Sequence, residues 1–230
     1  MKLMLETIIG LPIFGIALTL ATYSVALVIA RRINNSIANP TLIAALLVVL
    51  VSKAFGIPLE SYQVGGSVIA MLILPATISL AVPVYEQRRK LKRYFLPIIV
   101  GCSVGAATSL ASVTILSKLF SLEEIPSLSL LSKSVTAAIA MDLAKTLGAD
   151  VALTLMAVMV TGISGVLFGP PLLKLFKVED PILQGISMGT SSHVIGTSRA
   201  MEMGPVQGAI SSVAIFVTGI ATVVLTLLVF

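Results

Sequence analysis

The chain has 230 residues, of which 57% are hydrophobic and 11% are charged, and its mean hydropathy is +1.09. A soluble domain of this length carries roughly 57 charged residues, whereas this chain has 15 basic and 10 acidic ones, 25 in all. So few charges cannot cover a soluble globule. Eight spans of ~20 residues use roughly 160 positions, so we predict an all-α, polytopic membrane protein of about eight helical segments in one domain.

Residue counts exclude several kinds of site. A single cysteine, Cys102, and a single histidine, His193, exclude an internal disulfide framework and a metal centre built from several Cys or His side chains. The net charge of +5 could indicate a nucleic-acid-binding protein, but the basic residues cluster at the ends of the apolar segments. Membrane proteins have such clusters because their cytoplasmic loops carry an excess of Lys and Arg. We expect no cofactor, no metal and no nucleic-acid partner.

Eight apolar segments follow one another, at about 7–30, 40–57, 64–84, 94–119, 130–147, 150–173, 181–200 and 205–229. The first is too long for a signal-peptide core and lacks a convincing cleavage site, so we interpret it as a span. The fifth contains Lys133, Asp142 and Lys145, and the seventh contains His193, Arg199 and three glycines. Segments this polar are poor lipid-facing helices. We expect both to be broken or re-entrant and to meet near the midplane beside a cavity.

The basic residues also predict an orientation. Arg31–Arg32 and the 88–93 loop hold seven of the fifteen basic residues, and two segments separate them. Both clusters therefore lie on one face, which the positive-inside rule makes the cytoplasmic face of the cell inner (plasma) membrane. Glu123–Glu124 and the N-terminus then lie outside. If all eight segments cross, the C-terminus and the loop with Lys174 and Lys177 also lie outside, and the position of these two lysines conflicts with the rule.

Three short patterns recur in the same order. P-I-x-x-G-x-S-x-G occurs at 97–105 and at 181–189, Ser52-Lys53-x-x-Gly56 matches Ala144-Lys145-x-x-Gly148, and 74–76 is echoed at 169–171. Three segments separate each element from its counterpart, so the halves would be inverted in the membrane. We divide the chain into a first span and loop (1–38), repeat one (39–130), repeat two (131–203) and a last span (204–230). Inverted repeats with interrupted helices are typical of transporters.

The stretch 185–202 combines glycines, hydroxyls, an imidazole and a guanidinium group. A half-helix beginning near Thr197 would direct its free N–H groups towards His193, which favours an anion site. The alternative is that small residues permit close helix packing while Arg199 reaches the cytoplasmic interface. The candidate substrate-binding residues here are Ser192, His193, Gly196, Thr197 and Arg199.

A second stretch begins at Lys133, which shares a helical face with Thr136, as Asp142 does with Lys145. A lysine in an apolar segment costs several kcal/mol unless it is paired or reaches water. Lys133 and Thr136 are therefore candidate substrate-binding residues, the alternative for Lys133 being a snorkelling interfacial cation. Asp142 forms either a local ion pair with Lys145 or a proton-coupling group. The candidate proton-coupling residues are His193, Asp142 and Glu202.

The third segment is interrupted by Pro75 and Pro83, each of which removes a backbone donor and frees the carbonyl four residues back. The freed carbonyls and the Thr77 and Ser79 hydroxyls either bind substrate or bind one another around a kink. Pro75 and Thr77 are the candidate substrate-binding residues here.

Three motifs make the chain resemble the LrgB/CidB family over nearly its whole length. They are P-A-T-x-x-L-A-V-P-x-Y-x-Q at 75–87, K-S-V-T-x-x-I-A at 133–140 and G-x-x-x-G-x-x-S-H-x-x-G-T-x-R-A-x-E at 185–202, and Asn39–Pro40 also fits. Leu74 departs from the glycine expected there. The resemblance implies a membrane protein that modulates murein hydrolases and lysis alongside a small holin-like (LrgA/CidA-type) partner. Plastid relatives look like glycolate/glycerate exporters, and bacterial relatives are linked to pyruvate movement.

Two functions stay open. The first is transport of a small carboxylate of the glycolate, glycerate or pyruvate type, which the repeat, the polar breaks and the cations Lys133, His193 and Arg199 favour. The second is an antiholin-like regulator of murein hydrolase activity and cell lysis, acting with the holin-like partner. We favour transport, because no long amphipathic pore helix is present. No enzyme is expected, since there is no second histidine and no metal or nucleotide motif. The sequence is also compatible with a homo-oligomer, and it does not determine the oligomeric state.

Overall fold

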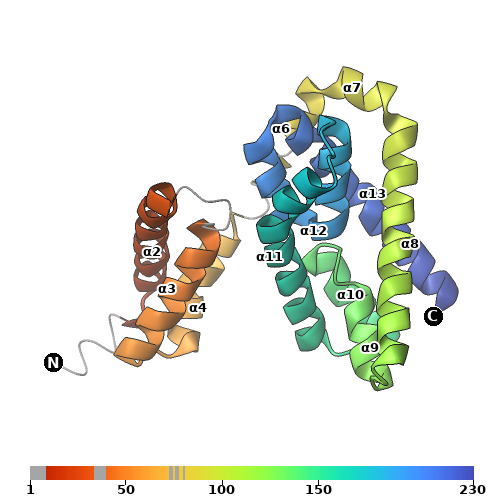
Figure 1. The fold of residues 1–230 in the computed structure, drawn as a ribbon. Coiled ribbons are helices and arrows are strands. Elements are labelled where there is room, and N and C mark those ends of the chain that lie inside the picture. The colour runs from red at the N-terminus through yellow and green to blue at the C-terminus, as the bar shows by residue number, and fades with distance from the viewer. Residues whose placement is uncertain (1–8, 34–39, 73–74, 76–77, 80) are drawn as a thin grey trace. The chain divides into compact units, whose positions relative to one another are not determined.

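The computed structural model describes residues 9–33, 40–72, 75, 78–79 and 81–230 (Figure 1). Every regular element in those residues is a helix, which confirms the predicted all-α class. The chain forms two compact units, Met1–Ser79 and Leu80–Phe230. Among the described helices, four are long and apolar enough to cross a membrane: α2 (Pro12–Ile33), α8 (Phe95–Leu119), α11 (Val151–Leu175) and α13 (Pro205–Val229). A 25-residue helix is roughly 37 Å long, against a hydrocarbon core of about 30 Å.

The first unit contains α2, α3 (Pro40–Phe55) and α4 (Leu59–Ala70), with α2 packed on both of the others. Gly15 of α2 and Gly65 of α4 touch backbone to backbone, and a Cβ on Gly65 would lie 2.4 Å from the Pro12 carbonyl oxygen. Beside this contact the Thr19 and Tyr62 hydroxyls share a hydrogen bond of 3.0 Å. The two glycines therefore let α2 and α4 cross at the shortest distance that helices allow.

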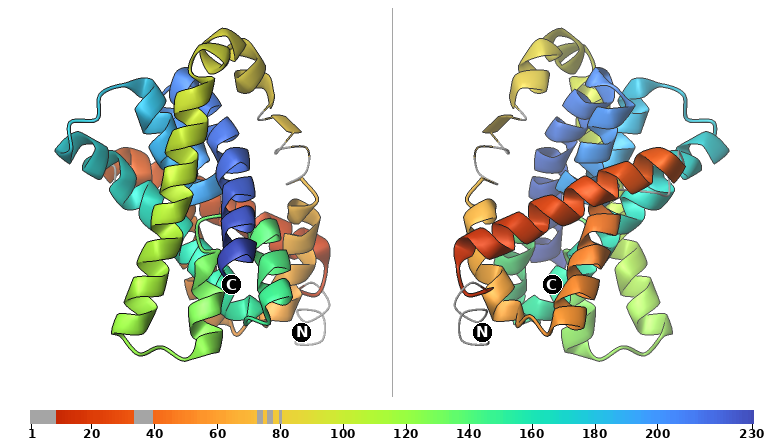
Figure 2. Two further views of the ribbon diagram at one scale, coloured as in Figure 1. Left: turned by 90° about the vertical axis from the view of Figure 1, so that its right-hand side faces the viewer. Right: turned by 90° about the vertical axis from the view of Figure 1, so that its left-hand side faces the viewer.

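The second unit holds the remaining described helices. In chain order they are α6 (Ala81–Glu86), α7 (Arg88–Arg93), α8, α9 (Glu124–Leu131), α10 (Ala137–Leu147), α11, α12 (Pro181–Met203) and α13. Residues 88–93, predicted as a loop, thus form a short helix. In Figures 1 and 2, α8 runs the length of this unit with α7 at one end and α9 at the other, and α13 lies beside α8. We call these two ends the α7 end and the α9 end.

The predicted fifth segment is a helical hairpin, α9–α10, with residues 132–136 between its arms. α9 turns back along α8, because its last residue, Leu131, packs against Leu110 in the middle of α8. α10 ends at Gly148, which has φ 69°, and α11 begins three residues later. Between them, the Asp150 N–H donates to the Ser129 hydroxyl of α9 at 3.0 Å. α10 has therefore returned to the α9 end, and the hairpin enters the unit without crossing it.

The predicted seventh segment, α12, is broken at Ser192 and His193. Their backbone angles are φ −135°, ψ 16° and φ 44°, ψ −139°, outside the helical region. The break divides α12 into a first arm, 181–191, and a second arm, 194–203, which are each too short to span a bilayer.

The two arms of α12 run in opposite directions along α13. The first arm runs parallel to α13, because Gly189 lies four residues after Gly185 and its contacts on α13 also lie four residues further on. The second arm runs antiparallel, because Thr197 bonds to Ser211 while the next turn of α12 packs on the earlier residue Gly208. α12 is therefore a second re-entrant hairpin with its tip at the break.

The two hairpins enter from opposite ends. Glu124 of α9 and Phe230 line one pocket at the α9 end, whereas Arg89 of α7 lines another with Asp180 and Val206, which flank the arms of α12. The prediction that both segments are broken or re-entrant is confirmed, and both are re-entrant hairpins. Because the fifth segment does not cross, the turn that carries Lys174 and Lys177 lies at the α7 end, and the conflict with the positive-inside rule disappears.

The structure contains two segments of similar architecture that run in opposite directions, but they are not the stretches that the matched sequence patterns paired. Residues 97–105 and 181–189 run in the same direction, since Gly101 lies against Ile186 and Gly105 against Thr190; an inverted pairing of these two stretches is wrong. What recurs in opposite directions is a span followed by a hairpin, α8 with α9–α10 and α11 with α12. The division into repeats 39–130 and 131–203 stays a prediction.

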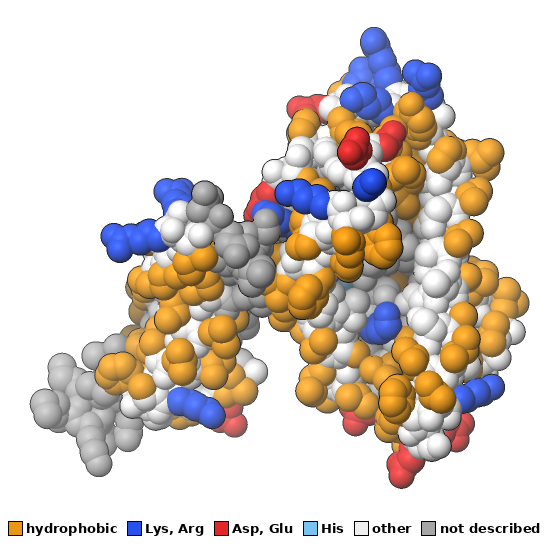
Figure 3. Space-filling view, viewed as in Figure 1, with side chains coloured by type: hydrophobic (Ala, Val, Ile, Leu, Met, Phe, Trp, Pro, Cys, Tyr) orange, Lys and Arg blue, Asp and Glu red, His pale blue; other side chains and the backbone are white. Residues whose placement is uncertain are grey.

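The interior of the second unit contains many buried hydroxyl side chains among its apolar ones, and its surface is largely apolar. Fully buried side chains include the hydroxyls of Thr154, Thr197, Ser211 and Ser212, whereas Phe95, Ile115, Val160 and Ile220 are exposed. Figure 3 shows hydrophobic side chains over much of the visible surface and basic ones gathered at the top, where α7 lies. This distribution fits a lipid environment, because soluble proteins rarely expose so large an apolar area to water.

Candidate functional site

A cavity of about 720 Å³ lies between α8, α11 and the tips of both hairpins. Ten of its nineteen lining residues carry hydroxyls, four are glycines and one, Lys133, is charged. Its hydroxyl-bearing residues are Thr108, Ser109, Ser112, Ser134, Thr161, Ser164, Ser187, Thr190, Ser191 and Ser192. A polar, concave space of this size inside a membrane-spanning unit is typical of a binding site for a small polar molecule.

Glycines on α8 and α11 make room for the tip of α12. A Cβ on Gly105 would lie 2.4 Å from the Thr190 methyl group, and a Cβ on Gly165 would lie 1.6 Å from the Ser192 hydroxyl. Any larger residue at either position must displace the tip. The shape of the cavity therefore depends on two helix faces that present no side chain.

Lys133 brings the positive charge. It lies at the tip of α9–α10, where its Nζ donates to the Ser109 hydroxyl at 3.3 Å and to the Ser134 hydroxyl at 3.2 Å. Ser109 stands fourteen residues from the start of α8 and ten from its end, so the ammonium group lies far from both ends. Within the described residues, no ion pair includes Lys133. An ammonium group held only by hydroxyls in an apolar unit attracts an anion.

Ser192 is the predicted residue of α12 that lines the cavity. It is 1% exposed, and its hydroxyl shares a 2.9 Å hydrogen bond with the Ser191 hydroxyl. Gly196 lies behind it, where a Cβ would stand 2.7 Å from the Met188 carbonyl oxygen of the other arm. The half-helix predicted to begin near Thr197 therefore begins earlier: the chain reverses at Ser192 and His193, and Gly196 lets the arms pack together.

His193 faces α11 and is not among the residues that line the cavity. It is 3% exposed, and its Nε2–H donates to the Val158 carbonyl at 3.0 Å. Val158 also packs against Val135, next to the tip of the other hairpin. The positive φ of His193 turns its side chain to this side, and such a conformation costs about 1–3 kcal/mol that the surroundings must offset. The structure therefore gives His193 a role in anchoring the tip of α12.

Thr197 and Arg199 lie on the second arm of α12, outside the cavity. The Thr197 hydroxyl, fully buried, donates to the His193 carbonyl at 3.0 Å and shares a 2.7 Å hydrogen bond with the Ser211 hydroxyl of α13. Arg199 is paired with Glu202 three residues on, as their spacing suggested. The predicted anion site of His193, Thr197 and Arg199 is thus not assembled, because the backbone reversal sends these side chains to α11, to α13 and towards the α7 end.

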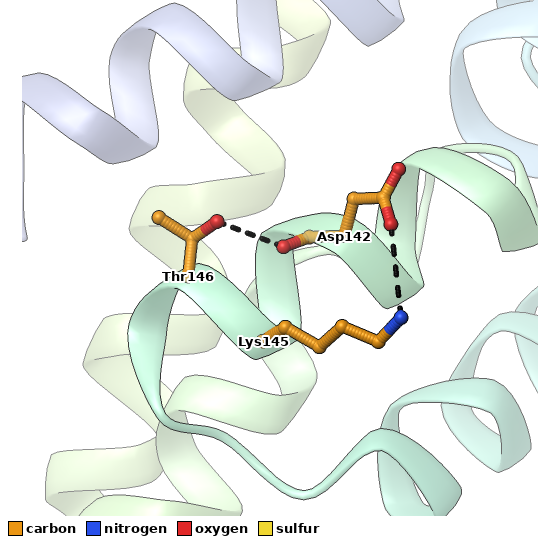
Figure 4. A network of polar contacts seen from close by, with 3 residues as sticks. All are labelled: Asp142, Lys145 and Thr146. Carbon is orange, nitrogen blue, oxygen red and sulfur yellow. Dashed lines mark hydrogen bonds and ion pairs between the residues drawn. The ribbon is translucent and has the colours of Figure 1, made fainter.

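The remaining predicted residues of the second unit, Thr136, Asp142 and Glu202, are also not among the residues that line the cavity. Thr136 begins α10, where its hydroxyl accepts from the Ile139 N–H at 3.5 Å. Asp142 and Lys145 are exposed on α10 and form the local ion pair predicted as one alternative, at 4.0 Å (Figure 4). The predicted proton-coupling residues His193, Asp142 and Glu202 do not lie together. Pro75 is exposed in the first unit, and Thr77 lies outside the described residues.

Several lining residues were missed from the sequence. They belong to α8 and α11, which looked like uninterrupted apolar spans. The signal was present as small and hydroxyl residues every three or four positions, the repeat of one helix face. This stripe consists of Gly101, Gly105, Thr108, Ser109 and Ser112 on α8 and of Thr161, Ser164, Gly165 and Gly169 on α11.

An apolar seal closes the cavity towards the α9 end. Leu110, Val113 and Leu131 form a buried cluster directly beyond Ser109 and Lys133. Past this cluster lies a second cavity of about 310 Å³, whose lining includes Lys118, Glu124 and Leu131. Two cavities separated by a few leucine and valine side chains resemble a pathway closed at one point.

Comparison with known proteins places the chain in a family. The model of the LrgB-like family matches residues 19–230. Proteins named "Antiholin-like protein LrgB" from Bacillus subtilis (strain 168), Bacillus mycoides (strain KBAB4) and Bacillus cereus (strain B4264) are similar to it, at 34%, 33% and 33% identity over 92%, 93% and 93% of both chains. No solved structure matches it. With this match over most of its length, the chain belongs to the LrgB-like family of multi-pass membrane proteins.

Proposed function

We propose that this protein carries small carboxylates across the cell membrane through the cavity between the two hairpins. The observation that supports the proposal is the juxtaposition of both hairpin tips on one polar cavity with a single cation, Lys133, in its wall. Re-entrant helices that meet from opposite sides of a membrane are a transporter architecture. With α7 on the cytoplasmic side, as its basic residues require, the protein is a multi-pass protein of the plasma membrane.

The lining of the cavity suits a small monoanion that also carries a hydroxyl or keto group. The Lys133 ammonium offers a charge-assisted hydrogen bond to a carboxylate. Neighbouring hydroxyls of Ser109, Ser134 and Ser191 both donate and accept, so they can hold the remaining oxygens of a glycolate, glycerate or pyruvate-type molecule. A dianion would find no second cation among the described lining residues.

The test is uptake of labelled glycolate, glycerate and pyruvate by sealed vesicles that contain the purified protein. Lys133→Gln should lower uptake roughly tenfold to a hundredfold, because losing a charge-assisted bond in a dry site costs about 1.5–3 kcal/mol and each 1.4 kcal/mol is tenfold. Lys145→Gln is the matched control, since it removes an exposed lysine with only a local partner and should leave uptake unchanged.

Thermal unfolding shows whether each protein is folded. Equal uptake by the folded wild-type protein and folded Lys133→Gln would refute the carrier role of this cavity. Uptake that is lost equally in Lys145→Gln would refute the assignment to Lys133. Lys133→Arg provides a further check, because uptake that is retained in this variant shows that the site requires a positive charge.

The names of the relatives favour a second candidate, an antiholin-like regulator of murein hydrolases and lysis that acts with a small holin-like membrane partner. A lesion-forming assembly releases dyes of all sizes from vesicles, whereas a carrier accumulates its substrate and retains the dye. Dye release that requires co-reconstituted partner protein, without carboxylate uptake by either protein, would establish this second function in place of the first.

A further inference from the structure

The helix α7 is held against the end of the second unit. Five of its six residues are basic, and the sixth, Leu91, packs with Tyr94 on the buried side chains of Ile98 and Ile182. These contacts join α7 to α8 and to the first arm of the α12 hairpin. The basic side chains of α7 are therefore presented from a fixed helix and not from a loose loop.

A pocket of about 310 Å³ lies between α7 and the base of the α12 hairpin. One side of the pocket is lined by Arg89, Lys90 and Arg93. The other side is lined by Pro181, the first residue of α12, and by Val206, the second residue of α13. Three basic residues line this space, and in the described part of the chain none of them has an ion-pair partner.

The single acidic side chain in the lining does not neutralise these cations. Asp180 caps α12, and its Oδ1 accepts from the Ile182 N–H at 2.7 Å and from the Leu183 N–H at 3.3 Å. Three basic groups against one occupied carboxylate leave a net positive pocket. Its complement is an anion with several oxygens, such as a phosphate group.

We infer that this pocket binds the phosphate headgroup of an anionic phospholipid, which ties α7 to the base of the α12 hairpin. A lipid is favoured over a soluble phosphate because Phe95 and Leu96 follow the pocket directly and are 60% and 69% exposed, at the start of a helix long enough to span a membrane. A phosphate in the pocket thus has an apolar surface beside it on which acyl chains can lie.

The test compares two double variants that remove the same charge from α7. Arg89→Gln with Arg93→Gln changes two residues of the pocket. Arg88→Gln with Lys92→Gln changes two residues outside it, since Arg88 stacks on Tyr85 and Lys92 lines a different cavity. Binding of phosphatidylglycerol and of phosphatidylcholine to the full chain in detergent is measured by native mass spectrometry, with thermal unfolding as a measure of folding.

We expect the pocket variant to bind the first phosphatidylglycerol roughly tenfold or more weakly and the control variant to change by less than about twofold, because an exposed charge outside a pocket contributes little. Arg89→Lys with Arg93→Lys should retain binding. Equal losses in both double variants, or equal binding of phosphatidylcholine, would overturn the proposal by showing diffuse or apolar attraction. Thermal protection by inorganic phosphate equal to that by phosphatidylglycerol would overturn it in favour of a soluble ligand.

Discussion

The contact between Gly165 of α11 and Ser192 at the tip of α12 predicts a large effect from a single methyl group. In Gly165→Ala the new Cβ would lie 1.6 Å from the Ser192 Oγ and 2.3 Å from its Cβ. Both distances are far below contact, so the tip must move. Overpacking of this kind costs about 1–3 kcal/mol, and we expect the same displacement to reduce carboxylate uptake, because Ser192 lines the cavity.

A second substitution isolates the cause. In Gly165→Ala with Ser192→Gly, the nearest atom of residue 192 is its Cα at 3.7 Å, an ordinary contact. The double variant should therefore recover most of the lost stability, with a coupling energy of about 1–3 kcal/mol between the two positions. Gly66→Ala is the matched control, because it adds the same methyl group to a helix where nothing lies within 4 Å.

The assay is thermal or denaturant unfolding in detergent of the wild-type protein, Gly165→Ala, Ser192→Gly, their double variant and Gly66→Ala, followed by vesicle uptake of those that fold. Unchanged stability in Gly165→Ala would refute the close approach of the α12 tip to α11. If Ser192→Gly fails to relieve the destabilisation of Gly165→Ala, the strain lies elsewhere. That result would refute the contact between Gly165 and Ser192 in the cavity wall.

Three further predictions concern the hairpins. His193→Ala should lower stability by about 1–3 kcal/mol, because it removes the buried hydrogen bond that joins the tip of α12 to the Val158 carbonyl; an unfolding midpoint equal to that of the wild-type protein would contradict the anchoring role. Arg199→Gln should leave carboxylate uptake nearly unchanged, since Arg199 lies outside the cavity beside Glu202; a tenfold fall in uptake with normal folding would restore it as a binding residue. Leu131→Ser should let small solutes leak through protein-containing vesicles, because it places a hydroxyl in the apolar seal; dye and carboxylate retention equal to that of wild-type vesicles would show that the seal lies elsewhere.

Composition and local pattern were sufficient for the class of the fold. Apolar runs of membrane-spanning length can satisfy their backbone groups in lipid only as helices. The same argument identified the two segments that do not cross, because the ionisable groups at Lys133 and His193 are costly against lipid. Both segments are hairpins in the structure, and Lys133 lines the cavity as predicted.

The exact place of a break was beyond local reasoning. Nine glycine and hydroxyl residues between Gly185 and Ser198 permit a reversal at several places. The bond of His193 to Val158 on α11 favours the one at Ser192 and His193. α9 is a similar case: residues 124–131 looked like part of a loop and a segment start, and they form a helix because Leu131 packs against α8.

Residue types and their order along the chain predict a helical membrane protein with two interrupted segments and a charge at Lys133. The packing of the helices against one another sets which side chains share the cavity. A helix repeat tells which residues lie on one face, but the neighbouring helix decides whether that face meets a cavity, as the stripe from Gly105 to Ser112 does, or lipid. At the tip of α12 the backbone reverses, so Ser192 reaches the cavity and its neighbour His193 reaches α11, because one non-helical φ turns adjacent side chains to opposite sides.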